Sequence, residues 1–141
     1  MSSSAREAAD RFHSAAIHAL RHVRREDPAT GIGPAQLSAL SVLVFGGPRT
    51  LGELASAEQV RPPTMTRIVH ALHDAGLVRR QHDSQDGRLV RLSATAKGKR
   101  LMQAARTRRI ANLAALLARL SPAEVKRVRE AADLVERALA Q

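Results

Sequence analysis

Residues 51–98 read LGELASAEQVRPPTMTRIVHALHDAGLVRRQHDSQDGRLVRLSATAKG and contain the signals that decide the fold. Thr50 and Glu53 match a capping box, in which a hydroxyl and a carboxylate bond each other's free backbone amides, so a short helix starts here. Prolines suit the first turn of a helix and not its middle. The double proline at Pro62 therefore predicts a second helix, which Gly76 ends. Two such helices joined by a tight turn form a helix-turn-helix.

Two short runs that contain Val and Leu, residues 77–82 and 88–93, follow the second helix. They are separated by a turn that contains Asp86 and Gly87, and Asp-Gly between two such runs is a strong β-hairpin signal. We therefore expect a hairpin wing directly after the helix-turn-helix.

Apolar residues at helical three-and-four spacing continue on both sides of this stretch. They predict helices over residues 5–25 and 34–46, and two more helices that start at the capping residues Thr95 and Ser121. The expected fold class is mainly α with a small β-hairpin wing, a winged helix-turn-helix with N- and C-terminal dimerisation helices. The terminal helices carry more apolar surface than the small central region covers, so a second copy of the chain is expected to cover them in a homodimer.

The composition points to duplex DNA as the partner. A formal net charge of +10 arises from 23 basic and 13 acidic residues, and basic side chains that neutralise phosphates gain affinity by releasing counterions. Readers of single strands and of RNA generally stack bases on aromatic rings. The chain has two Phe and no Trp or Tyr, so duplex DNA is favoured and the core should be aliphatic.

The expected organisation is one domain over residues 1–141, since this length suits a single core. Residues 5–46 and 95–140 are expected to be mainly dimerisation helices. Residues 48–94 are expected to form the winged helix-turn-helix that binds DNA.

The outward face of the second helix combines guanidinium groups, which bind phosphates or guanine edges, with small hydroxyls that allow close approach. An Arg on a protruding wing suits a narrow minor groove with negative potential. An Asp beside it is expected to orient that Arg, because phosphates repel a carboxylate. The expected DNA-binding residues are Thr50, Arg61, Pro63, Thr64, Thr66, Arg67, His70, Asp86 and Arg88. The alternative for the helix residues is an ordinary solvated face.

Several other classes are disfavoured. The chain has no cysteine and no apolar run near the length of a membrane span, so we expect a cytoplasmic protein without membrane contact. His18 and His22 are one helical turn apart, but a zinc site needs three or four ligands, so no metal or cofactor is expected. No Gly-rich phosphate loop, nucleophile elbow or HExxH motif is present, which argues against an enzyme.

The pieces LGELA, TMTRIVHALHDAGLV, DSQDGR and LSATAKG together resemble the MarR family of bacterial regulators, and the flanking helices follow the order of that family. The resemblance covers essentially the whole chain. It implies a dimer with interlocked terminal helices, a recognition helix in the major groove of a pseudo-palindromic operator, and a wing Arg in the minor groove. It also implies a transcription repressor that a small, aromatic or phenolic effector releases.

By position, the resemblance places Pro63, Thr64, Thr66 and Arg67 on the recognition contacts of the family, and Asp86 with Arg88 on its wing motif. Three positions depart from the pattern: Arg61 replaces a common capping Ser, Gln59 a common Gly, and Gly87 a frequent second wing Arg.

An effector pocket of the implied kind is lined by the first, second and fifth helices. It makes four residues candidates for holding an anionic effector: His13, His18, Arg21 and His22. The rival hypothesis is a constitutive architectural or nucleoid-type protein, which binds DNA by charge and has no effector.

Overall fold

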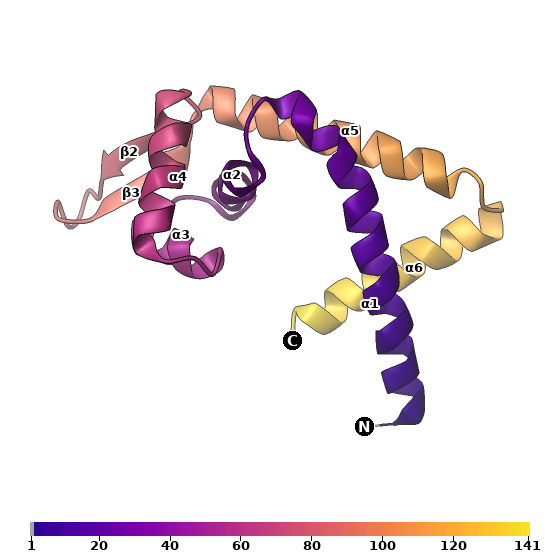
Figure 1. Cartoon of the computed structure of the whole chain (residues 1–141). Helices are drawn as coiled ribbons and strands as arrows, with labels where there is room; N and C mark the ends of the chain where they lie inside the picture. The colour runs from indigo at the N-terminus through magenta and orange to yellow at the C-terminus, as the bar shows by residue number, and fades with distance from the viewer. Residues whose placement is uncertain (1) are drawn as a thin grey trace. The chain divides into compact units, whose positions relative to one another are not determined.

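The computed structural model describes residues 2–141 and is mainly helical with one small sheet (Figure 1). The elements in chain order are α1 (Ser3–Val23), the 3-10 helix η1 (Arg24–Thr30), α2 (Pro34–Gly46), β1 (Arg49–Thr50), α3 (Leu51–Ala57), α4 (Pro62–Asp74), β2 (Val78–His82), β3 (Val90–Ala94), α5 (Ala96–Leu117) and α6 (Pro122–Leu139). The expected fold class is confirmed. The capping, proline and glycine signals locate the helix ends because they decide where backbone amides and carbonyls find partners.

The chain forms two compact units, each with its own packing. The winged-helix unit comprises residues 26–107, and the terminal-helix unit comprises residues 2–25 and 108–141. The winged-helix unit thus includes α2 and the start of α5. The reason is that Leu40 of α2 and Met102 of α5 are buried in the same core as Leu54 of α3. The assignment of whole segments to dimerisation stays a prediction.

The core of the winged-helix unit is aliphatic, as the composition predicts. Its most deeply buried large side chains come from α2, α3, α4, β2 and the turn that precedes β2: Leu40, Leu54, Met65, Val69, Leu72, Leu77 and Val78. Both Phe side chains are exposed instead, Phe12 by 52% and Phe45 by 56%. The interior therefore holds the helices together through small aliphatic contacts.

The sheet has three antiparallel strands in the order β1-β3-β2. The hairpin of β2 and β3 was expected, whereas β1 was not, because a two-residue strand is too short to show alternation. Arg49 and Thr50 of β1 pair with Leu92 and Arg91 of β3. The start of α3 is thus bonded to the base of the wing.

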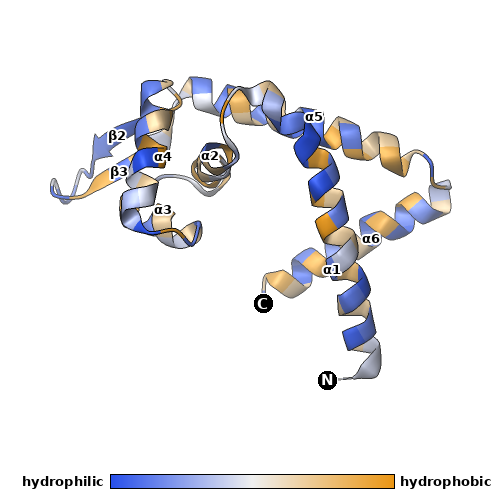
Figure 2. Cartoon of the chain, viewed as in Figure 1, coloured by the Kyte–Doolittle hydropathy of each residue, from blue (hydrophilic) through white to orange (hydrophobic). Residues whose placement is uncertain are grey.

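The terminal-helix unit leaves much apolar surface exposed. α6 is strongly amphipathic, yet none of its 18 residues is buried, and apolar and polar residues alternate along both α1 and α6 (Figure 2). Val128 of α6 is 40% exposed and Leu139 is 76% exposed. Among residues 2–141, no single helix is long and apolar enough to cross a membrane, and one bent pair, residues 3–30 with 34–46, passes on length and composition only.

Candidate DNA interface

Helix α4 has one face in the core and one in solvent. Met65, Val69 and Leu72 are buried, and this spacing fixes which side chains point outward. Pro62 occupies the first turn, where a missing amide hydrogen costs nothing. Arg61 is the N-cap residue, but its guanidinium has no acceptor atom for the free amides and makes no capping bond. The Arg61 residue is exposed to solvent.

The outward face of α4 brings together most of the expected DNA-binding residues. Arg61, Pro63, Thr66, Arg67 and His70 are exposed. Positions 63, 66, 67 and 70 follow the i, i+3, i+4, i+7 pattern of one helix face. We call this set, residues 61, 63, 66, 67 and 70, the recognition face. Its contact with DNA stays a prediction.

Two of the expected residues have additional local partners, and a third is less exposed. The Thr66 hydroxyl donates to the Pro62 carbonyl oxygen at 3.0 Å. His70 Nε2 lies 3.2 Å from Asp74 Oδ2 on the next turn, with both side chains mostly exposed. Thr64 is half-buried and so lies at the edge of the recognition face.

Thr50 forms the N-cap of α3. Its hydroxyl oxygen accepts a hydrogen bond from the Glu53 amide at 3.2 Å, which is the threonine half of the expected capping box. The hydroxyl therefore stabilises the N-terminal end of α3. A phosphate contact by Thr50 stays a prediction.

The turn between α3 and α4 is tied to α2. The Ser38 hydroxyl donates to the Glu58 carboxylate, with distances of 2.9 and 2.8 Å to its two oxygens. Gln59 follows with φ of 55°, a left-handed conformation that favours Gly. This geometry explains the positional preference for Gly at residue 59 in the family that the sequence resembles.

The loop between β2 and β3 is organised by Asp83. Its Oδ1 accepts hydrogen bonds from the amides of Gln85 at 2.8 Å and Asp86 at 3.3 Å, and its own amide donates to the Leu89 carbonyl oxygen at 2.8 Å. Its Oδ2 accepts from Arg91 Nε at 2.8 Å. One carboxylate thus joins both sides of the wing loop.

The hydrogen bond from Arg91, with the two loop amides, lowers the pKa of the Asp83 carboxyl to about 2. The same hydrogen bond raises the pKa of the Arg91 guanidinium. Both shifts agree that the pair is ionised at neutral pH. Asp83 therefore offsets the positive charge that Arg91 places on this strand.

Asp86 acts on Arg88 through the backbone. Asp86 Oδ1 accepts from the Arg88 amide at 3.0 Å, and the Leu89 amide donates to the Asp86 carbonyl oxygen. The Arg88 side chain is exposed in this turn. Asp86 therefore holds the backbone of Arg88, and its role in orienting the Arg88 side chain towards DNA stays a prediction.

Sequence reasoning missed Asp83 as the central residue of the wing. The available signal was the spacing in Asp83-Ser-Gln-Asp86, since an Asp side chain that accepts from the amides two and three residues later is a common turn device. Asp83 and Arg91 also line an open polar cleft of about 250 Å³ on the sheet, together with Pro48, Gln81, His82, Ser84 and Ser93.

The four effector candidates all lie on α1, in the terminal-helix unit. His13, His18 and Arg21 are exposed, and His22 is half-buried. Within residues 2–141, no three His, Cys, Asp or Glu side chains lie close enough to share a metal ion. The effector assignment stays a prediction.

Comparison with known proteins bears on the fold and on the family. The profile of the MarR family matches residues 32–90. The chain is 41% identical over 135 residues to an HTH-type transcriptional regulator of Mycobacterium bovis, an alignment that covers 96% of this chain and 94% of the relative.

Two solved structures have the same fold. A MarR family protein from Bacillus stearothermophilus matches with a TM-score of 0.83 at 24% identity, over 98% of this chain and 96% of that chain. A mutant of MepR from S. aureus bound to an oligodeoxyribonucleotide matches with a TM-score of 0.69 at 20% identity, over 93% of this chain and 96% of that chain.

Proposed function

This chain belongs to the MarR family of transcriptional regulators, and on that premise we propose that it binds a pseudo-palindromic operator in duplex DNA as a homodimer and represses transcription there. The observation that carries the proposal is the recognition face of α4. It presents Arg61 and Arg67 to solvent, while the opposite face of the same helix is fixed in the core by Met65 and Val69.

The chemistry of this face suits the major groove. Guanidinium groups bind guanine O6 and N7 or phosphate oxygens with two parallel hydrogen bonds, whereas the small Pro63 and Thr66 permit close approach to base edges. In the proposed complex Arg88 enters the adjacent minor groove from the wing, and the amides at the start of α4 face the phosphates. The fold is also that of the MepR mutant solved with an oligodeoxyribonucleotide.

A second copy of the chain is the proposed cover for the terminal helices. Monomeric proteins rarely expose long apolar stripes, yet Val128 and Leu139 on α6 and Phe12 on α1 are all substantially exposed. In a two-fold symmetric dimer the same surface of a second chain covers these side chains, and the assembly is closed. Such a dimer carries two recognition faces, so its operator has two half-sites about one helical turn apart.

Repression and its release complete the proposal. A dimer on an operator that overlaps a promoter excludes polymerase, and a small anionic effector held by His18, Arg21 and His22 releases it. These side chains fall on one side of α1 by helical spacing. His13 lies on the preceding turns of the same helix.

The test is a salt titration of binding. Genomic fragments are selected with the purified protein, and affinity for the recovered fragment and for random duplex DNA of equal length is measured between 50 and 200 mM salt. A regulator binds its operator on the order of 10³ times more tightly than random DNA. Equal affinities would instead support the architectural alternative, for which the net charge of +10 is the argument.

A further inference from the structure

The segment that ends α4, the helix that carries the recognition face, is bonded to the start of α5 through three consecutive carbonyl groups. The Ala75 carbonyl oxygen accepts from Lys97 Nζ at 2.9 Å. The Gly76 oxygen accepts from the Thr95 hydroxyl at 2.6 Å. The Leu77 oxygen accepts from the Thr95 amide at 3.0 Å. We call residues 75–77 and 95–98 the α4–α5 clasp.

Gly98 lets the two elements approach this closely. A Cβ atom at this position would overlap the Leu77 carbonyl oxygen and lie 3.3 Å from Leu40 Cδ1. The Gly98 amide in turn donates to the Thr95 hydroxyl oxygen at 3.1 Å. The Thr95 hydroxyl thus donates to the end of α4 and accepts from the first turn of α5, so it belongs to both helix ends.

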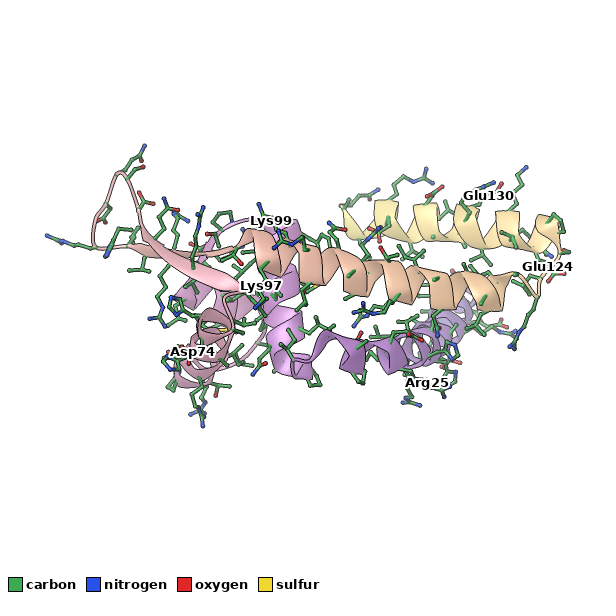
Figure 3. The ribbon with its side chains drawn as sticks, turned by 90° about the horizontal axis from the view of Figure 1, so that it is seen from above. Arg25, Asp74, Lys97, Lys99, Glu124 and Glu130 are labelled. Atoms are coloured by element: carbon green, nitrogen blue, oxygen red, sulfur yellow. The ribbon has the colours of Figure 1, made fainter. Side chains whose placement is uncertain are left out.

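Lys97 adds an electrostatic part to the clasp. Its ammonium lies at the C-terminal end of α4, where the helix dipole is negative and carbonyl groups have no intrahelical partner. Its stem also passes over Gly76, with Cδ 3.9 Å from the position that a Cβ would take there. Lys97 lies on the side of α5 that faces the end of α4, whereas Lys99 lies on the other side (Figure 3).

The clasp holds the C-terminal end of α4, so a small change of angle there causes a larger displacement at the N-terminal end. Helix α4 has 13 residues, and at a rise of 1.5 Å per residue it is about 20 Å long, so a tilt of about 6° at its end displaces its first turn by about 2 Å. That first turn carries Arg61 and Pro63. The DNA-facing end of the helix is therefore sensitive to how its other end is held.

We propose that Thr95, Lys97 and Gly98 are positioning residues that set the angle of the recognition helix against α5, and thereby the operator spacing that the protein prefers, without touching DNA. The consequence for DNA rests on the function proposed above. The angle between α4 and α5 does not depend on that function, so it is measured separately.

The first measurement needs no DNA. The chain has no cysteine, so spin labels on Thr66→Cys and Arg106→Cys, both exposed and in the winged-helix unit, report the α4–α5 geometry by electron–electron distance measurement. Labelled protein is diluted with unlabelled protein to suppress distances between protomers. We expect one narrow distance in the parent and a shifted or broadened one after Lys97→Met.

Matched variants separate positioning from charge and from folding. Lys99→Met removes the same charge two residues away, and should leave the distance unchanged. Thr95→Val removes the hydroxyl at constant shape and should broaden the distribution of spin-label distances. Thr95→Ser keeps the hydroxyl and should give the narrow distribution of the parent. Thermal unfolding of each variant confirms that the folded protein is measured.

The second measurement uses the unlabelled protein and operators in which the two half-sites are one base pair closer or farther apart. We expect Lys97→Met to lower the preference of the protein for its native spacing by about threefold or more, while binding to random DNA falls only as much as in Lys99→Met. Identical spin-label distances in Lys97→Met and Lys99→Met would overturn the clasp. A changed distance with unchanged spacing preference would overturn its role in DNA recognition. If the parent does not distinguish operator from random DNA, the proposed function fails while the distance result still decides the clasp.

Discussion

Arg91 on β3 donates from Nε to Asp83 Oδ2 at 2.8 Å, and so bonds the strand that leaves the wing loop to the residue that begins it. The other carboxylate oxygen of Asp83 accepts from the amides of Gln85 and Asp86. The ionised carboxylate of Asp83 therefore holds the first half of the turn that presents Arg88, and Asp86 bonds the Arg88 amide itself.

This arrangement makes the wing sensitive to acid. The pKa of Asp83 is about 2 in the folded protein against an ordinary 3.8, so its stabilising contribution is complete above about pH 4 and is lost as the pH falls towards 2. An NMR titration should show the Asp83 carboxyl and the backbone amides of Gln85 and Asp86, which bond to it, changing together near pH 2. The variant Asp83→Asn should lack this transition, and an Asp83 that titrates near 3.8 would contradict the bonded loop.

Arg88 should contribute directly to operator affinity. If its guanidinium enters the minor groove, Arg88→Ala weakens operator binding by about 1–3 kcal/mol. Fluorescence anisotropy at fixed salt measures the loss. Arg129→Ala, which removes one exposed charge from α6, serves as the control, and equal losses in the two variants would remove the wing from the mechanism.

A carboxylate on the apolar face of α6 should dissociate the dimer. Val128→Asp places a charge in the proposed interface, where burial without a partner costs several kcal/mol. Light scattering at increasing concentration should give a dimer for the parent and mainly monomer for the variant. Lys126→Asp puts the same charge on the polar side of the helix and should remain dimeric. A parent that is monomeric throughout rules out the proposed dimer.

Two glycines in helices should respond in opposite directions to the same substitution. Gly98→Ala forces a Cβ against the Leu77 carbonyl and should lower the free energy of unfolding by about 1–3 kcal/mol. Gly52→Ala, in α3, has open space around it and should raise that free energy by about 0.4–1 kcal/mol. Chemical denaturation measures both, and a neutral Gly98→Ala would mean that the two segments are not packed so closely.

Gln59 should be replaceable by glycine with a gain in stability. Its φ of 55° costs an L-residue about 1 kcal/mol that glycine avoids, so Gln59→Gly should raise the melting temperature. Ser56→Gly, in the regular part of α3, should lower it, because glycine there only adds entropy to the unfolded chain. A drop in both variants would argue against the left-handed turn.

Local chemistry made the fold predictable from sequence. Three signals act within a few residues of themselves, so their effects are predictable without the rest of the chain: the Thr50 cap, the double proline at Pro62 and the Asp86-Gly87 turn. The same holds for the recognition face, because burial of Met65 and Val69 at helical spacing leaves Arg67 outside.

Contacts between distant residues were decided only by the tertiary structure. The bond from Arg91 to Asp83, the β1 strand, and the clasp that Lys97 and Thr95 make with the end of α4 join residues 8 to 43 positions apart. A sequence shows that Arg91 is positive and that Lys97 is polar, but the partner of each depends on which segments the aliphatic core brings together. The sequence by itself therefore determined the elements and their outward faces. Packing added the bonds that orient the wing and α4.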